Sequence, residues 1–147
     1  MLKAEAFMRE ALREAALDEN EVPVGALIVK DGHIIARAHN EREKNGPFAH
    51  AEMLAMARAC QALGTRRLHG CTLYVTLEPC PLCSGGILLA EVDQCVFGAF
   101  DQRQGCCGSV YTLPEDAHFY HRAACIGGVL EQECAEQLRR FFEKKRE

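Results

Sequence analysis

The sequence predicts an α/β fold in three layers (α/β/α), with a central mixed five-stranded sheet between two layers of helices. Three observations support this prediction. Segments with apolar residues at helical spacing alternate with short apolar or β-branched segments. A tight Asp-Gly turn joins the first two strands as a hairpin, and helices separate the later strands. We therefore expect helices on both faces of the sheet.

The first half of the chain is expected to form a helix, a hairpin and a second helix. The segment Glu21-Val22-Pro23 ends the first helix, Asp31-Gly32 makes the hairpin turn, and Gly64 ends the second helix. The apolar run before the turn lacks helical polarity, which favours a buried strand. The expected elements are a helix over 2–18, strands over 24–29 and 34–39, a loop over 40–49 and a helix over 51–63.

The second half of the chain alternates strands with helices. Pro81 suits the first turn of a helix, and Pro114 is expected to stop a short helix before it. The last helix carries acidic residues early and basic residues late, an order that complements the helix dipole. The expected elements are strands over 72–77, 92–99 and 123–128, helices over 81–91, 110–113 and 131–145, and a loop over 101–108.

Length and composition indicate a single domain over residues 1–147. A hydrophobic content of 48% is enough for a sizeable core. The net charge of −4 argues against a protein that coats nucleic acid through an overall positive charge, but it leaves room for a local basic patch. No apolar run could span a bilayer and the first residues begin no signal peptide, so we expect a cytoplasmic protein that does not enter a membrane.

The chain contains nine cysteines, of which Cys80 and Cys83 form a C-x-x-C pair. The other seven are odd in number and lack the spacing of a disulfide framework. In a reducing cytosol they are most simply small buried apolar residues. The adjacent pair Cys106-Cys107 is a poor clamp for zinc, so packing is the favoured interpretation and a redox role is the minor one.

Two short stretches, His50-Ala51-Glu52 and Pro79-Cys80-Pro81-Leu82-Cys83, carry groups suited to zinc chemistry. His50 offers an imidazole nitrogen, and Cys80 and Cys83 offer thiolates on one face of a helix start. A structural zinc site is closed by four ligands, whereas a catalytic site leaves one position for water. Because only three ligands are evident, we expect a catalytic zinc, with Glu52 close enough to carry a proton for that water.

Simpler interpretations exist for each half of this pattern. A C-x-x-C pair alone could be buried thiols or a redox pair, and an H-x-E triplet alone could be chance. Both halves occur here in the order H-x-E…P-C-x-x-C, and both open expected helices. This order is the signature of zinc deaminases that act on nucleobases, so it favours a catalytic zinc over either simpler interpretation.

Further stretches resemble those of a known family over nearly the full length. They are Glu21–Ala26, Asn40, Ala49–Glu52, Thr72–Cys80, Val96–Ala99, Asp101, Gly108-Ser109, His121-Arg122 and the helix with Cys134, Phe141 and Phe142. With them the chain resembles the cytidine-deaminase-like superfamily, and within it the bacterial tRNA-specific adenosine deaminases of the TadA type. The zinc motif alone specifies only the superfamily, whereas 21–26, 97–101 and the last helix narrow the resemblance.

The resemblance implies a homodimer that holds the anticodon stem-loop of an arginine tRNA and converts its wobble adenosine to inosine. It implies one Zn²⁺ per subunit, bound by His50, Cys80 and Cys83, with Glu52 as the proton shuttle. The residues that it implies at the substrate are Asn40 and the Ala51 backbone at the nucleoside, Val24 and Pro79 at the pocket wall, and Asp101 near the flanking nucleotides. The chain departs from the family pattern at Phe100, in the bulky loop 102–107 and at Phe119-Tyr120.

Aromatic and basic residues are the candidates for contact with RNA, because bases stack on aromatic rings and phosphates pair with cations. The candidates for stacking are Phe48, Phe119 and Tyr120, those for phosphate contact are Arg103, Arg122, Lys144 and Lys145, and His121 stands at a family-like position. Ordinary packing and solvated surface charge are the alternative interpretations of these residues.

Two other functions compete with deamination of tRNA. The same zinc site would serve a deaminase of a free nucleobase or nucleoside of the cytosine, cytidine or guanine type. A zinc-stabilised binding module without activity is the other alternative, but the intact Glu52 and the absence of a fourth protein ligand argue against it. A pocket that opens to a wide basic groove would favour RNA, and one that closes over a small ligand would favour a free base.

Overall fold

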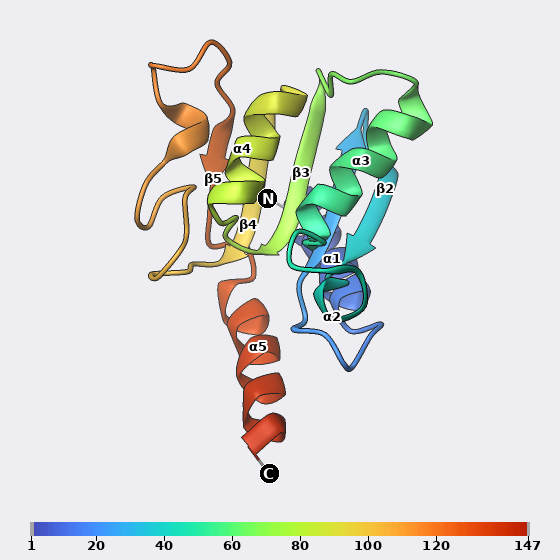
Figure 1. The fold of residues 1–147 in the computed structure, drawn as a ribbon, viewed down its shortest axis with the longest axis vertical. Helices are drawn as coiled ribbons and strands as arrows, with labels where there is room; N and C mark the ends of the chain where they lie inside the picture. The colour runs from blue at the N-terminus through green and yellow to red at the C-terminus, as the bar shows by residue number, and fades with distance from the viewer. Residues whose placement is uncertain (1, 147) are drawn as a thin grey trace.

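A mixed sheet of five strands lies between two layers of helices in the computed structural model, which describes residues 2–146 (Figure 1). The strands are β1 (Gly25–Lys30), β2 (His33–His39), β3 (Cys71–Leu77), β4 (Gln94–Ala99) and β5 (Ala124–Ile126). Their order across the sheet is β2-β1-β3-β4-β5. β1 pairs antiparallel with β2 and β3, whereas β3, β4 and β5 are parallel. The predicted three-layer fold is thereby confirmed.

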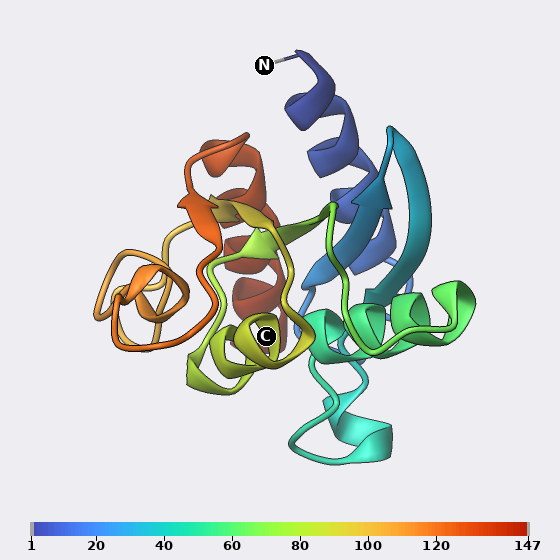
Figure 2. The ribbon, with the colours of Figure 1, turned by 90° about the horizontal axis from the view of Figure 1, so that it is seen from above.

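The helices divide between the two faces of the sheet. α1 (Leu2–Ala15) and α5 (Glu131–Arg146) cover one face, while α3 (Ala51–Leu63) and α4 (Pro81–Ala90) cover the other (Figure 2). The short helix α2 (Arg42–Asn45) and the 3-10 helix η1 (Leu113–Glu115) lie in connections. None of the helices within residues 2–146 has both the length and the apolar composition of a membrane span.

The core has two parts, one on each side of the sheet. Leu27 and Val29 of β1 lie on the face that α1 and α5 cover, in one buried cluster with Met8 and Cys134. Ile28 lies between them in sequence and points to the other face, toward α3 and α4. Successive side chains of a strand alternate between faces, so a strand covered on both faces is apolar throughout. This explains why the run 24–29 shows no alternation of polarity.

Two expectations for the first half of the chain need correction. The first helix ends at Ala15 rather than at residue 18, because the next two amides turn back to carbonyl groups only three residues earlier. The expected loop 40–49 contains α2. The buried Glu21 carboxylate accepts hydrogen bonds from the backbone N–H groups of Arg42 and Glu43, both at 2.9 Å. It therefore satisfies donors that the start of a short helix leaves unpaired.

Two further expectations, both in the second half, were also wrong. The strand expected from residue 92 begins at Gln94, because the Val92 N–H donates to the Ile87 carbonyl at the end of α4. The expected helix over 110–113 is absent, and η1 instead includes Pro114 near its first residue. Proline lacks an N–H group, so it costs no hydrogen bond in the first turn of a helix.

The close approach of α1 to β1 requires glycine at position 25. A Cβ atom at Gly25 would lie 1.9 Å from the Ala11 carbonyl oxygen and 2.7 Å from the Ala15 nitrogen. We expect Gly25→Ala to force the helix off the strand and to lower the free energy of unfolding by about 1–3 kcal/mol. Thermal denaturation followed by circular dichroism measures this loss.

Gly85→Ala in α4 is the matched control, because a Cβ atom at this position would have nothing within 4 Å. Alanine is favoured over glycine in helices by about 1 kcal/mol, so this variant is expected to be as stable as the wild type or more so. Equal melting temperatures for Gly25→Ala and wild type would contradict the tight contact.

Candidate active site

Two helices begin side by side on one face of the sheet, and the two predicted zinc-binding stretches stand at their N-termini (Figure 1). His50 is the residue immediately before α3 and Cys80 the residue immediately before α4. Both have extended backbone angles, as N-cap residues usually do. Pro81 occupies the first turn of α4, as predicted. The chain leaves β3 at Leu77 and reaches Cys80 within three residues, which places the cysteine pair just beyond the C-terminal end of the central strand.

The ligand atoms of His50, Cys80 and Cys83 all lie within 4.8 Å of one another, and the His50 Nδ1 atom is 3.6 Å from the Cys80 Sγ atom. In the described part of the chain, this is the one group of three such side chains close enough to hold a metal ion. Imidazole nitrogen and thiolate sulfur are ligands that zinc prefers. Three ligands leave one coordination position open, so the donor set fits a catalytic zinc ion.

The ionisation of these groups is coupled through short contacts. A hydrogen bond from the Cys83 thiol lowers the pKa of Cys80 to about 4. The same hydrogen bond, together with burial, raises the pKa of Cys83, and a hydrogen bond with Cys80 raises the pKa of His50. Without a metal, a proton therefore stays on Cys83. Thiolate is the form that binds metal, so zinc must displace this proton when it binds.

Glu52 lies in the first turn of α3, two residues after His50, and is buried. Burial raises the pKa of its carboxyl group to about 7. A carboxyl group at this position can both accept and donate a proton, as a general base and acid must. The arrangement therefore suits the transfer of protons beside a metal-bound reactant.

A cavity of about 90 Å³ opens beside this group. It is lined by Val22, Val24, Asn40, Arg42, His50, Glu52, Leu77, Glu78, Cys80, Asp101 and Gln104. Val24, Asn40 and Asp101 were expected at the substrate, whereas Ala51 and Pro79 are buried and are not among the lining residues. The expected roles of these five residues stay predictions.

Asn40 connects the two segments that border the cavity. Its Oδ1 atom accepts a hydrogen bond from the Ala51 N–H at 2.9 Å, and its Nδ2 group donates to the Val22 carbonyl at 3.2 Å. The two groups that were expected to hold a nucleoside are thus bonded to each other. Asn40 therefore also fixes the start of α3.

Arg42, Leu77, Glu78 and Gln104 line the cavity but were not singled out from the sequence. Arg42 lies in α2, a helix that the local sequence did not predict. Glu78 belongs to the family-like stretch 72–80, but no role was assigned to it. In the sequence, the only signal for Glu78 was its position just before the C-x-x-C motif. In the structure Glu78 is buried, and acidic residues are rarely buried without partners.

The candidate RNA-contact residues lie in separate places. Phe48 is 74% exposed just before His50, and Arg103 lines a cavity against α5. Lys144 and Lys145 line another cavity between α5 and the loop after α1. The remaining four candidates follow one another in the chain near the C-terminal end of α4: Phe119, Tyr120, His121 and Arg122. The Tyr120 hydroxyl donates a hydrogen bond to Glu91, and the His121 ring is hydrogen-bonded to the Val92 carbonyl. Their contact with RNA stays a prediction.

This fold and this site define a zinc-dependent deaminase. The family model of the cytidine and deoxycytidylate deaminase zinc-binding region matches residues 1–99, and the chain belongs to this family. The tRNA-specific adenosine deaminase of Bacillus subtilis is 51% identical over 99% of this chain and 92% of its own length. That of Aquifex aeolicus is 46% identical over 97% of this chain and 95% of its own length.

Solved structures agree with this assignment. A structure from a study of A-to-I editing by tRNA:A34 deaminases matches with a TM-score of 0.84 and 41% identity, over 90% of this chain and 98% of that one. A guanine deaminase from Nitrosomonas europaea matches with a TM-score of 0.80 at 22% identity, over 93% of this chain and 83% of that one, which supports the fold alone.

The metal group makes a direct prediction about zinc content. We expect the purified wild-type protein to carry one zinc per chain and Cys83→Ala to lose it, because two ligands hold zinc far less tightly than three. Cys60→Ala removes a thiol that lies in α3 outside the group and is expected to keep full zinc content. Elemental analysis of both variants measures the difference, and full zinc occupancy in Cys83→Ala would rule out this ligand.

Proposed function

We propose that this protein converts adenosine to inosine at the wobble position of a tRNA anticodon, by zinc-dependent hydrolysis that releases ammonia. The observation that carries this proposal is full-length similarity to tRNA-specific adenosine deaminases at 51% and 46% identity. The site supports it, because a buried carboxyl group lies beside a three-ligand metal group in a small cavity. Such a cavity suits a reaction on one base that has left its stack.

The chain's own residues divide the chemistry between them. His50, Cys80 and Cys83 would hold the zinc ion, which activates a water molecule for attack when bound. Glu52 accepts a proton from the attacking water and delivers it to the ring nitrogen beside C6 of adenine. It then carries the second proton to the amino group, which leaves as ammonia. One water is consumed, one C–O bond forms and one C–N bond breaks.

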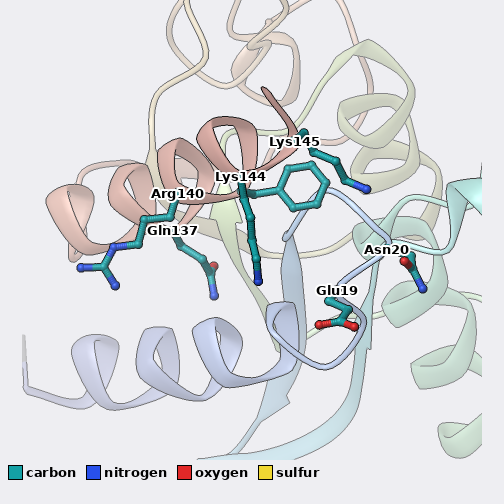
Figure 3. Close-up of a pocket in the computed structure, with 7 residues that line it drawn as sticks. Glu19, Asn20, Gln137, Arg140, Lys144 and Lys145 are labelled. Carbon is teal, nitrogen blue, oxygen red and sulfur yellow. The ribbon is translucent and has the colours of Figure 1, made fainter. Parts of the chain in front are cut away.

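Basic residues of α5 and of the 101–108 loop are the proposed contacts for RNA phosphates. Lys144 points from α5 toward the loop that follows α1, where Glu19 and Asn20 border a cavity of about 420 Å³, and Gln137 points to α1, where it donates to the Leu12 carbonyl (Figure 3). A second cavity of about 400 Å³ is lined by Arg103, Arg139, Phe142, Glu143 and Arg146. Positive charge gathered on one helix can pair with phosphates although the net charge of the chain is −4.

The proposal extends to the substrate and to the location of the protein. The anticodon stem-loop of an arginine tRNA is the expected substrate, and a cytoplasmic location is expected with it. All nine cysteines are free, which suits a reducing compartment.

Deamination of a free base is the second candidate function. A guanine deaminase structure from Bacillus subtilis is 41% identical to this chain, although it covers only 65% of this chain with a TM-score of 0.62. The small cavity would also suit a free base. Activity on guanine, cytosine or cytidine, without activity on a stem-loop, would favour this candidate.

Inosine formation in RNA tests the proposal and the role of Glu52 together. We expect the wild-type protein to form inosine at the wobble position of an arginine tRNA anticodon stem-loop. Glu52→Gln keeps the shape of the side chain but cannot carry the proton, so turnover is expected to fall by about 10²–10⁴-fold or more. Sequencing for inosine and an ammonia assay measure both results.

Zinc content separates the role of Glu52 from that of the metal ligands. Glu52→Gln is expected to keep one zinc per chain, since its side chain is not part of the ligand group. Undiminished turnover in this variant would refute the assignment of Glu52, whereas a wild-type protein that leaves the stem-loop unchanged would refute the proposed function.

We also propose a homodimer that forms through an apolar face on α4. This α4 face consists of Gly85, Leu88, Leu89, Leu113, Phe119, Tyr120 and His121, which surround a cavity of about 290 Å³. Leu89 is 79% exposed and Tyr120 is 82% exposed. Neighbouring apolar side chains that are exposed together mark interaction sites on soluble proteins, and a twofold dimer buries the same face on both copies.

Light scattering tests the α4 face. We expect the wild type to be a dimer at micromolar concentration. Leu89→Glu is expected to be a monomer, because a dimer of this variant would bury a charge without a partner. Leu17→Glu is the control, since Leu17 is 68% exposed outside the α4 face and its replacement is expected to leave the dimer intact. A dimeric Leu89→Glu variant would place the interface elsewhere.

A further inference from the structure

A single buried carboxylate organises the loop between β4 and η1. Glu78 directly follows β3 and is 2% exposed. Its Oε1 atom accepts hydrogen bonds from the Asp101 N–H at 2.9 Å and from the Ser109 hydroxyl at 2.5 Å. Its Oε2 atom accepts from the Cys107 N–H at 3.1 Å and from the Ser109 N–H at 2.8 Å. One side chain thus ties down both ends of the segment 101–109.

The loop is closed tightly around this carboxylate. A Cβ atom at Gly105 would lie 2.3 Å from the Glu78 carboxyl group, so only glycine lets the backbone pass. The Gly105 N–H donates to the Asp101 carbonyl at 2.8 Å, and the Cys106 N–H donates to the Pro79 carbonyl at 2.8 Å. The conformation of the loop is therefore defined by Glu78 and by its neighbour in the sequence.

The same loop provides one wall of the candidate active site. Asp101 and Gln104 both line the cavity that contains Glu52. The Asp101 Oδ1 atom accepts from the backbone N–H groups of Arg103, at 3.0 Å, and Gln104, at 3.2 Å. Glu78 fixes Asp101, and Asp101 in turn fixes the turn that carries Gln104. A change at Glu78 would therefore move Asp101 and Gln104 in the wall of the cavity.

Glu78 has no capacity left for chemistry. A carboxylate offers about four lone-pair sites, and here four donors occupy them. Glu78 is also outside the group of His50, Cys80 and Cys83. A buried carboxylate is costly unless it is fully hydrogen-bonded, so these four contacts account for its burial. Its role is to hold other groups in place.

We propose that Glu78 is a positioning residue for the substrate, which sets the place of Asp101 and Gln104 against the nucleotide that enters the cavity. This inference rests on the proposed function, because it assigns the loop to contact with RNA. Glu78 thus controls how well the stem-loop is bound, and leaves the proton transfers of Glu52 unchanged. Loss of binding that the ground state and the transition state share raises KM while kcat stays the same.

Glu78→Gln tests the proposal, because glutamine keeps the size but turns one acceptor into an N–H₂ group that faces backbone donors. With the anticodon stem-loop as substrate, we expect KM to rise about tenfold or more and kcat to change by less than about threefold. Zinc content is expected to stay at one per chain. Steady-state kinetics, elemental analysis and thermal denaturation of the same preparation give the three readouts.

Two further variants keep the test decisive. Glu14→Gln is the control for a lost buried carboxylate, since Glu14 is 6% exposed, binds His39 and Arg37, and does not line the cavity. It is expected to lose stability with an unchanged KM. Gly105→Ala keeps Glu78 in the chain, but its Cβ atom would push the loop away from the Glu78 carboxyl group. It is therefore expected to raise KM as Glu78→Gln does, and the double variant is expected to add little. If Glu78→Gln does not fold, the KM of Gly105→Ala tests the proposal.

The outcomes are distinct. An unchanged KM in Glu78→Gln and Gly105→Ala, with a loss of stability like that of Glu14→Gln, would make Glu78 a purely structural residue and overturn the proposal. Loss of zinc together with kcat would show that Glu78 acts on the metal group, which also overturns it. A wild-type protein that does not deaminate the stem-loop refutes the proposed function itself, whereas an active wild type with an unaffected Glu78→Gln variant refutes only this inference.

Discussion

Two helix N-termini lie side by side on one face of the sheet, and this arrangement brings the ligands of the metal group together. His50 precedes α3 and Cys80 precedes α4, so an imidazole and a thiolate meet from segments 30 residues apart. The N-terminus of a helix favours negative charge, which suits the thiolate. The remaining parts of the site, from Glu52 in α3 to the loop after β4, are arranged around these two helix starts.

Buried carboxylates serve opposite purposes around the cavity. Glu21 and Glu78 accept hydrogen bonds from backbone N–H groups and hold opposite segments, α2 and the 101–109 loop. Glu52 instead lies beside the metal group, where burial raises its pKa to about 7. The same residue type thus holds the backbone where backbone N–H groups donate to it, and suits proton transfer where it lies beside the metal group.

Local patterns predicted what depends on local chemistry. The hairpin at Asp31-Gly32 and the helix 51–63 follow from turn residues and periodicity. The metal group joins segments 30 residues apart, and it was predicted because its ligand types occur in the order of a known motif. α2 and the 101–109 loop depend on Glu21 and Glu78, which lie about twenty to thirty residues away in sequence, so no local window contains their cause. Apart from His121, which stands at a family-like position, the RNA-contact candidates were chosen by residue type, and residue type carries no information on where a side chain lies. The single domain and the roles of the site residues stay predictions.

The net negative charge of the chain affects how RNA would approach the basic end of α5. Lys144, Lys145 and Arg146 gather positive charge in the last turn of α5, while the molecule as a whole carries a charge of −4. Beyond a Debye length of about 10 Å these charges are largely screened, so the basic end of α5 attracts an RNA backbone only at close range. Under the proposed function, such a protein does not collect RNA through long-range attraction. It retains a molecule only when an exposed loop reaches the cavity and the basic helix together, so selectivity begins before any base is read.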